Sequence, residues 1–231
     1  METDTWIGGE NAQFPSTQIS LVEAAGQGLE SDALERVAAL YWKPVYRFIR
    51  VKFRKDNEDA KDLTQGFFAS ALGHDFFARF DPAKASFRTY LRMAVERFAA
   101  NQHVSANRQK RGGDVQFEPL DNQAAATESP EELFEREWQR QLFCLAVEDL
   151  RTHCDRFGKQ IQYQVFAAYD LTSGERSTYA EVAAACGVPE TTITNHLAWA
   201  RRMLRGFVTD RLRGTTSGPR ELHEEARRIW S

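Results

Sequence analysis

The chain has 231 residues, of which 42% are hydrophobic and 27% charged, and it carries a net charge of −3. This composition is ordinary for a globular protein with one large domain or two small ones. No apolar run approaches the roughly 20 residues that cross a bilayer, and acidic residues rather than a basic segment follow Met1, which excludes a signal peptide. We therefore expect a cytoplasmic protein with no membrane partner.

The small net charge conceals an uneven distribution. Residues 88–111 contain six bases against Glu96 alone, and residues 112–132 contain six acids and no base. A second basic segment places five arginines between residues 201 and 213, opposed only by Asp210. Because phosphates respond to local potential rather than to net charge, these segments indicate a nucleic acid partner.

The first periodic segment covers residues 32–53 and has apolar side chains at helical spacing. Pro44 interrupts it, which predicts a kink or a helix boundary near Trp42. The next helix is expected to begin at Asn57 or Glu58 and to carry three polar side chains on its outer face. These are Asp59, Asp62 and Gln65.

An aromatic loop at residues 76–80 precedes a long basic helix that Ser86 is placed to cap. The spacing of Phe87, Leu91 and Phe98 assigns these side chains to the core, whereas Tyr90 fits either the core or a base-binding surface. Residues 112–130 are acidic and show no periodicity, and we interpret them as a linker.

A second helical unit contains a helix-turn-helix pattern over residues 179–197. Small Ala183 allows two helices to approach, Gly187 supplies the turn, and Ile193 and Leu197 hold the second helix in place. The outer face of this second helix has polar side chains suited to the major groove, and arginines follow where phosphates would lie. An ordinary helical hairpin with a glycine turn is the alternative.

Four motifs, taken together and in order, resemble extracytoplasmic-function (ECF) sigma factors. Residues 41–50, 59–68 and 87–91 are similar to the region-two core domain, and the helix-turn-helix resembles the promoter-reading region four. The resemblance implies an all-α fold of two helical domains joined by a flexible acidic linker. It also implies a transcription initiation factor that binds core RNA polymerase and directs promoter recognition and DNA melting.

The implied organisation divides the chain into five parts. They are a disordered N-terminus (1–16), a region-two domain (17–111), the linker (112–130), a region-four domain (131–213) and a tail (214–231). In the tail, Pro219 is suited to start a helix whose apolar residues recur at helical spacing. This helix either packs within the chain or covers a binding face until a signal arrives.

The resemblance assigns three sets of site residues. Contact with the clamp coiled coil of the largest polymerase subunit is implied for Asp59, Asp62, Leu63, Gln65 and Phe68. Contact with the minus-ten element is implied for Phe77, Phe80, Arg88, Tyr90, Arg92, Arg97, Asn101 and Arg108. Contact with the minus-thirty-five element is implied for Thr191, Thr192, Thr194, Asn195, Ala198, Arg201 and Arg202, with the polymerase flap as a further partner.

The acidic docking face departs from the family pattern at Lys61, where an acid is common. Thr64 on the same helix is therefore a candidate phosphorylation site, because a phosphate adds about −1.5 to −2 charges. A Ser/Thr kinase or an anti-sigma factor is accordingly a possible regulatory partner.

Two other functional classes are alternatives. A stand-alone helix-turn-helix regulator explains residues 177–213 but leaves residues 59–68 without a role. An enzyme is disfavoured because the chain has no phosphate-binding glycine loop and no catalytic triad motif. We expect no cofactor and no metal, and we expect the cysteines Cys144, Cys154 and Cys186 to be reduced and buried in helices.

Overall fold

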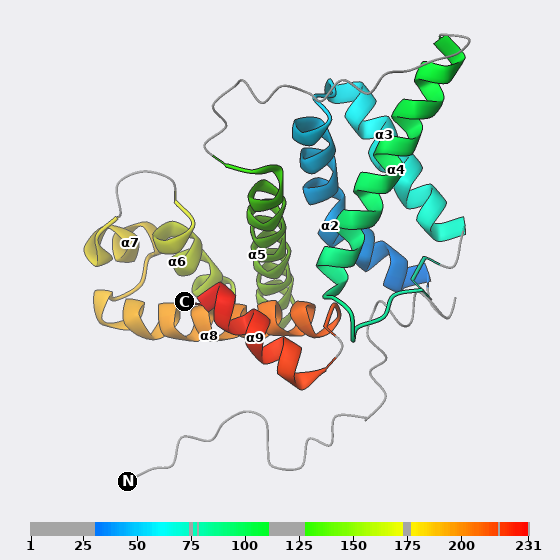
Figure 1. The fold of residues 1–231 in the computed structure, drawn as a ribbon. Coiled ribbons are helices and arrows are strands. Elements are labelled where there is room, and N and C mark those ends of the chain that lie inside the picture. Colours follow the sequence, from blue (N-terminus) through cyan, green and yellow to red (C-terminus); the bar gives the residue numbers. More distant parts are fainter. Residues whose placement is uncertain are drawn as a thin grey trace.

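The computed structural model describes residues 31–73, 76–77, 79–110, 128–172, 177–216 and 218–230. Within these ranges all regular structure is helical, so the all-α prediction is confirmed (Figure 1). The predicted N-terminus (1–16) and most of the predicted linker lie outside the described residues. The helices are α2 (Ser31–Lys52), α3 (Asn57–Gly73), α4 (Phe87–Lys110), α5 (Pro130–Phe157), α6 (Gln160–Asp170), α7 (Tyr179–Cys186), α8 (Glu190–Arg213) and α9 (Pro219–Trp230).

The first group of helices, α2 to α4, begins and ends close to the predicted positions. Helix α2 continues through Pro44, so a boundary near Trp42 is not found. Burial of Tyr41, Val45 and Phe48 on one face of α2 stabilises the helix on both sides of the proline. Ser86 caps α4 as expected, its hydroxyl oxygen accepting a hydrogen bond from the Thr89 amide at 3.3 Å.

The second group, α5 to α8, is built around a long helix. Helix α5 opens with a capping box in which Ser129 and Glu132 satisfy each other's backbone amides at 3.1 and 2.8 Å. Its 28 residues extend about 42 Å, so α5 reaches beyond its own group. Its C-terminal half packs Leu150 and Cys154 against Phe166 and Ala200 of α6 and α8.

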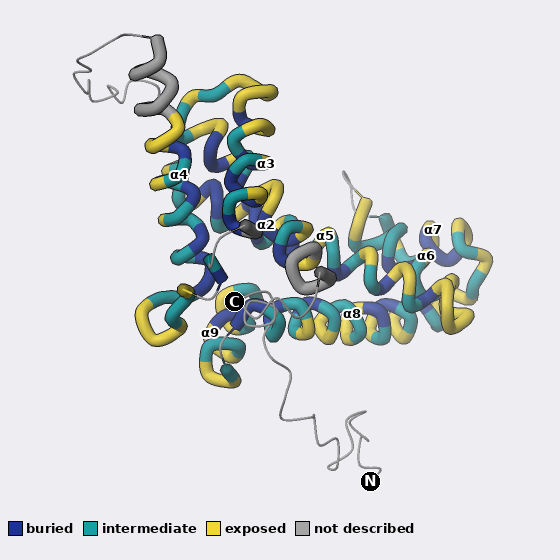
Figure 2. The backbone as a smooth tube through the Cα atoms, turned by 90° about the vertical axis from the view of Figure 1, so that its right-hand side faces the viewer, coloured by how far each residue is buried: buried dark blue, intermediate teal, exposed yellow. Residues whose placement is uncertain are grey.

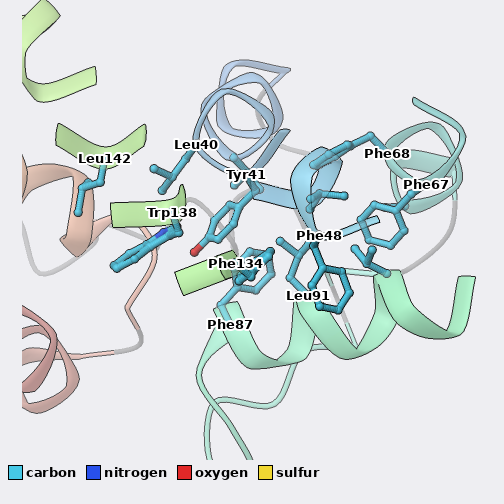
Figure 3. Packing of buried hydrophobic residues seen from close by; sticks show 14 of the residues in the cluster. Leu40, Tyr41, Phe48, Phe67, Phe68, Phe87, Leu91, Phe134, Trp138 and Leu142 are labelled. Carbon is cyan, nitrogen blue, oxygen red and sulfur yellow. The ribbon is translucent and has the colours of Figure 1, made fainter. Parts of the chain in front are cut away.

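The N-terminal half of α5 packs instead on α2. Phe134 and Trp138 of α5 are buried in the same cluster as Tyr41 and Phe48 of α2, and the Phe48 and Phe134 rings meet edge to face at 5.8 Å (Figure 3). The end of α8 contributes Leu212 to this cluster. The two groups of helices therefore share one hydrophobic core, which burial of large aromatic side chains stabilises.

The tail helix α9 begins at Pro219 as predicted and docks on the rest of the chain. Its apolar face, with Leu222, Ala226 and Ile229, packs on the shared core. The indole of Trp230 meets the ring of Phe143 edge to face at 5.5 Å. Packing within the chain, one of the two predicted roles of the tail, is thus present.

The three cysteines are free thiols in different settings. Cys154 is buried as expected, Cys186 is half-buried, and Cys144 is exposed, because it faces outward on α5. Across the described helices, none is long and apolar enough to span a membrane.

Candidate functional site

The helix-turn-helix is formed by α7 and α8 and has the predicted parts. Thr178 and Glu181 form a capping box at the start of α7, and Gly187 ends it with φ 66°. Val182 and Ala183 of α7 are buried against Ile193 and Leu197 of α8. The turn and the helix contacts therefore hold the start of α8 rigidly at the surface.

The outer face of α8 presents the predicted reading residues. Figure 2 shows buried and exposed positions recurring along this helix. Thr192 is half-buried, and its hydroxyl donates to the Pro189 carbonyl at 2.7 Å, so this hydroxyl already has a partner within the protein. The other residues of the set are exposed: Thr191, Thr194, Asn195, Ala198, Arg201 and Arg202.

Arg201 is already engaged within the protein. Its guanidinium makes a bidentate ion pair with Asp170, with both nitrogen–oxygen distances 2.8 Å. The hydrogen bonds to Asp170 raise the pKa of Arg201 above its usual value. Contact between Arg201 and a phosphate would therefore compete with a preformed pair, whereas neighbouring Arg202 is exposed on the same face.

Helix α3 presents an acidic face to solvent. Asp59, Asp62 and Gln65 are exposed, and the Asp56 carboxylate caps the helix by accepting from the Asp59 amide at 2.8 Å. Lys61 pairs with Glu58 at 2.9 Å. Lys55 also pairs with Asp59, at 3.7 Å, so this face brings three acids, Glu58, Asp59 and Asp62, together with two lysines.

Among the residues of the basic helix α4 whose side chains the structure describes, the exposed ones lie in its middle. Arg97 and Asn101 are exposed, and so is Met93, which the sequence reasoning did not select. Arg92 is half-buried and pairs with Glu131 of α5 at 3.2 Å. Arg108 belongs to α4, but its side chain lies outside the described part of the structure.

The family described as "ECF sigma factor" matches residues 19–209, which is most of the chain and spans both groups of helices. The chain belongs to the ECF sigma factor family. No curated protein matches the sequence. As a sigma factor it is a transcription initiation factor that binds core RNA polymerase and directs promoter recognition, with DNA binding through a helix-turn-helix. This match favours the initiation factor over the stand-alone regulator.

The sigma factor does not expose Thr64, contrary to the phosphorylation hypothesis. The side chain is fully buried, and its hydroxyl donates to the Ala60 carbonyl at 2.7 Å. Thr64 belongs to the inward stripe of Ala60, Phe67 and Ala71, a spacing that the sequence already contained. A kinase cannot reach this hydroxyl in the folded arrangement.

Two predicted polymerase-binding residues of the sigma factor belong mainly to the core. Phe68 is buried and stacks on the half-exposed indole of Trp42 with ring centroids 5.5 Å apart. Leu63 is half-buried and packs on the same core. Trp42, which was not predicted as a site residue, is the aromatic side chain that α2 and α3 present to solvent here.

The predicted melting aromatics are also largely internal. Phe77 is buried and stacks on Phe87 at 6.0 Å, and Phe80 meets Phe87 edge to face at 5.3 Å. Tyr90 is half-buried, stacks on Phe76 at 4.8 Å and donates its hydroxyl hydrogen to the Phe76 carbonyl at 2.8 Å. In this arrangement Phe77 is a core residue and does not line a pocket that could receive a flipped base.

Arg88 is the largest departure from the predicted DNA surface of the sigma factor. Only 8% of the residue is exposed, and its guanidinium pairs with Glu135 of α5 at 2.7 Å and with Glu225 of α9 at 3.0 Å. The guanidinium also lies 3.9 Å from the ring centroid of Trp138. The prediction that Arg88 faces DNA is wrong here, because three groups from two other helices enclose it.

The acidic partners offset the burial of the Arg88 guanidinium. Burial by itself lowers the pKa of Arg88, but the nearby acidic groups, Glu135 foremost, raise that pKa above its usual value. The partners stand 47 and 137 residues away along the chain. No local sequence signal identifies them.

Replacing Gly187 with alanine is expected to lower the free energy of unfolding by about 1 kcal/mol. An added Cβ would meet no atom within 4 Å, so the cost comes from the left-handed backbone conformation alone. Gly206, which is helical and equally open, is the control, and its alanine variant should be as stable as the wild type or more stable. Urea denaturation of both variants measures the difference, and equal destabilisation would contradict this account.

Proposed function

We propose that this ECF sigma factor docks on the polymerase clamp coiled coil through the exposed face of α3. The exposure of Asp59 and Asp62 on one helix face is the observation that carries the proposal. Two carboxylates separated by three positions lie on the same side of a helix and suit a basic helical partner. Gln65 continues the face, and Trp42 adds an exposed apolar surface beside it.

The reading surface for the minus-thirty-five element is proposed to be the exposed start of α8. Thr191, Thr194 and Asn195 would face base edges, since the N-terminal part of a recognition helix enters the major groove deepest. Arg202 would contact the phosphate backbone, which positions the helix without specifying sequence. The group α5–α8 would be the part held by the polymerase flap.

The minus-ten surface is proposed to centre on the exposed middle of α4, with Arg97 and Asn101. Melting a promoter costs a few kcal/mol for each base that is unstacked. Basic side chains along the captured strand offset that cost by neutralising phosphates, and half-exposed aromatic side chains offset it by stacking. Tyr90 lies about two turns before Arg97 on this helix and is the aromatic candidate.

These surfaces support division of the chain into a region-two unit over residues 17–111 and a region-four unit over residues 131–213. The first unit would include α2, α3 and α4, and the second α5 to α8. The intervening residues 112–130 would serve as the connector between the two promoter elements.

The docking surface is tested by reversing one charge. Asp62→Lys is expected to weaken binding to bacterial core polymerase by at least tenfold, measured by fluorescence anisotropy of the labelled sigma factor, because a lysine would oppose a basic coiled coil. Asp155→Lys, an equal charge reversal at an exposed site on α5, should bind within twofold of wild type. Equal affinities of the two variants would contradict the assignment of α3.

The promoter specificity itself is tested by transcription in vitro on a pool of genomic promoter fragments. Core polymerase with the sigma factor should start at a defined subset that core polymerase alone does not use. Asn195→Ala should reduce initiation at that subset or change its membership, because base contacts determine specificity. An unchanged pattern of start sites would remove α8 from promoter reading.

A further inference from the structure

The packed arrangement of the sigma factor is too short to reach two promoter elements at once. Arg88 at the start of α4 and Leu212 near the end of α8 line one small cavity, so these two helix ends are adjacent. The reading residues around Ile193 lie at the opposite end of α8, about 29 Å away at about 1.5 Å per residue. Asn101 lies about 20 Å along α4 from Arg88 by the same measure.

The promoter requires a greater separation. The minus-ten and minus-thirty-five elements are about 25 base pairs apart, which is about 85 Å of duplex at about 3.4 Å per base pair. Even laid end to end, the relevant parts of α4 and α8 would extend only about 50 Å. The contacts between α2 and α5 must therefore open before both surfaces meet their elements.

The chain has the length to open in this way. Residues 111–129 lie between α4 and α5, and nineteen residues span up to about 65 Å when fully extended. Opening would expose Phe134 and Trp138, which are now buried against α2. It would also separate Lys52 of α2 from Glu131 of α5, whose side chains pair at 2.9 Å.

Helix α9 adds contacts that hold the packed arrangement together. The Glu225 carboxylate receives two hydrogen bonds from Arg88, at 3.2 and 3.0 Å, and it is 7% exposed in its side chain. Farther along α9, Trp230 contacts Phe143 of α5. The guanidinium of Arg205 on α8 lies 5.5 Å from the centroid of the Trp230 ring. One short helix thus joins α4, α5 and α8, which belong to both groups.

We propose that α9 is an intramolecular latch that holds the sigma factor closed through Glu225 and Arg88, and that it releases when the holoenzyme forms. This inference rests on the proposed polymerase and promoter surfaces. The acidic face of α3 stays exposed in the closed form, so core polymerase can dock there first. Opening then consumes part of the binding free energy. The observed Kd equals the Kd of the open form divided by the fraction of chains that are open.

Glu225→Gln in the full chain is expected to bind core polymerase about fivefold more tightly than wild type, and deletion of residues 218–231 about tenfold more tightly. The matched control is Glu224→Gln, a neighbouring α9 carboxylate that is exposed and pairs only locally with Arg220. This control should bind within twofold of wild type. Affinities of the Glu225→Gln and deletion variants equal to that of Glu224→Gln would overturn the latch.

Hydrogen exchange on the wild-type chain separates this inference from the proposed function. Adding core polymerase should speed exchange of amides 219–230 and slow exchange of α3. Unchanged protection of 219–230 in a holoenzyme whose α3 is protected would overturn the latch alone. If α3 gains no protection, the docking proposal fails. The latch is then tested in the free chain, where Glu225→Gln should speed hydrogen exchange of α9 and the control Glu224→Gln should not.

Discussion

Replacement of Arg88 with alanine is expected to lower the free energy of unfolding by about 3–5 kcal/mol. The substitution removes the cation from above Trp138 and leaves the buried carboxylate of Glu225 without its main partner. A buried charge that loses its counterion retains the full cost of desolvation. Chemical denaturation followed by circular dichroism measures the loss.

Arg97→Ala on the same helix is the matched control. This arginine is exposed, so its truncation should change stability by less than about 0.5 kcal/mol. Arg88→Lys should fall between the two, because a lysine keeps the charge but cannot pair with two carboxylates in the planar geometry of a guanidinium. Similar stability of the Arg88→Ala and Arg97→Ala variants would show that the enclosure of Arg88 does not exist in solution.

Phe134→Ala should cost about 3–5 kcal/mol, since it empties a fully buried site between α5 and α2. Phe134 belongs to the second group of helices but packs on residues of the first. Its loss should therefore also make the two groups unfold separately. We expect calorimetry to change from one transition toward two.

Phe157→Ala is the control, as the same residue type at the exposed end of the same helix. Its truncation should cost less than about 1 kcal/mol and leave a single transition. A small effect of Phe134→Ala would mean that the two groups of helices do not share a core and that the closed form does not exist in solution.

The closed form gives the tail and the interface a common role. The carboxylates of Glu135 and Glu225 surround a cation at the start of the basic helix, while the docking face on α3 remains open to solvent. In the proposed latch, association with polymerase through the proposed docking face would begin before the two promoter-reading surfaces are free to move apart.

Most helices of this protein could be predicted from the sequence because their signals are local. The apolar spacing of α3, the cap at Ser86, the glycine of the helix-turn-helix and the proline that starts α9 all act within a few residues. The exposed face of the reading helix follows from the same periodicity. The burial of Thr64 was also predictable from this spacing, since the residue shares the inward stripe of Ala60 and Phe67.

Periodicity and capping depend on neighbours one or two turns away, so the helices, their caps and the outward faces of α3 and α8 could be predicted from the amino-acid sequence, as could the family. The environment of Arg88, the burial of Phe77 and the docking of α9 are set by the tertiary structure. These depend on which helices meet, and the contacts of Arg88 join residues 47 and 137 positions apart. The sequence around a basic residue does not show whether its partner is a phosphate or a distant carboxylate. In this protein the packing of α5 on α2 brings the carboxylate of Glu135 to Arg88.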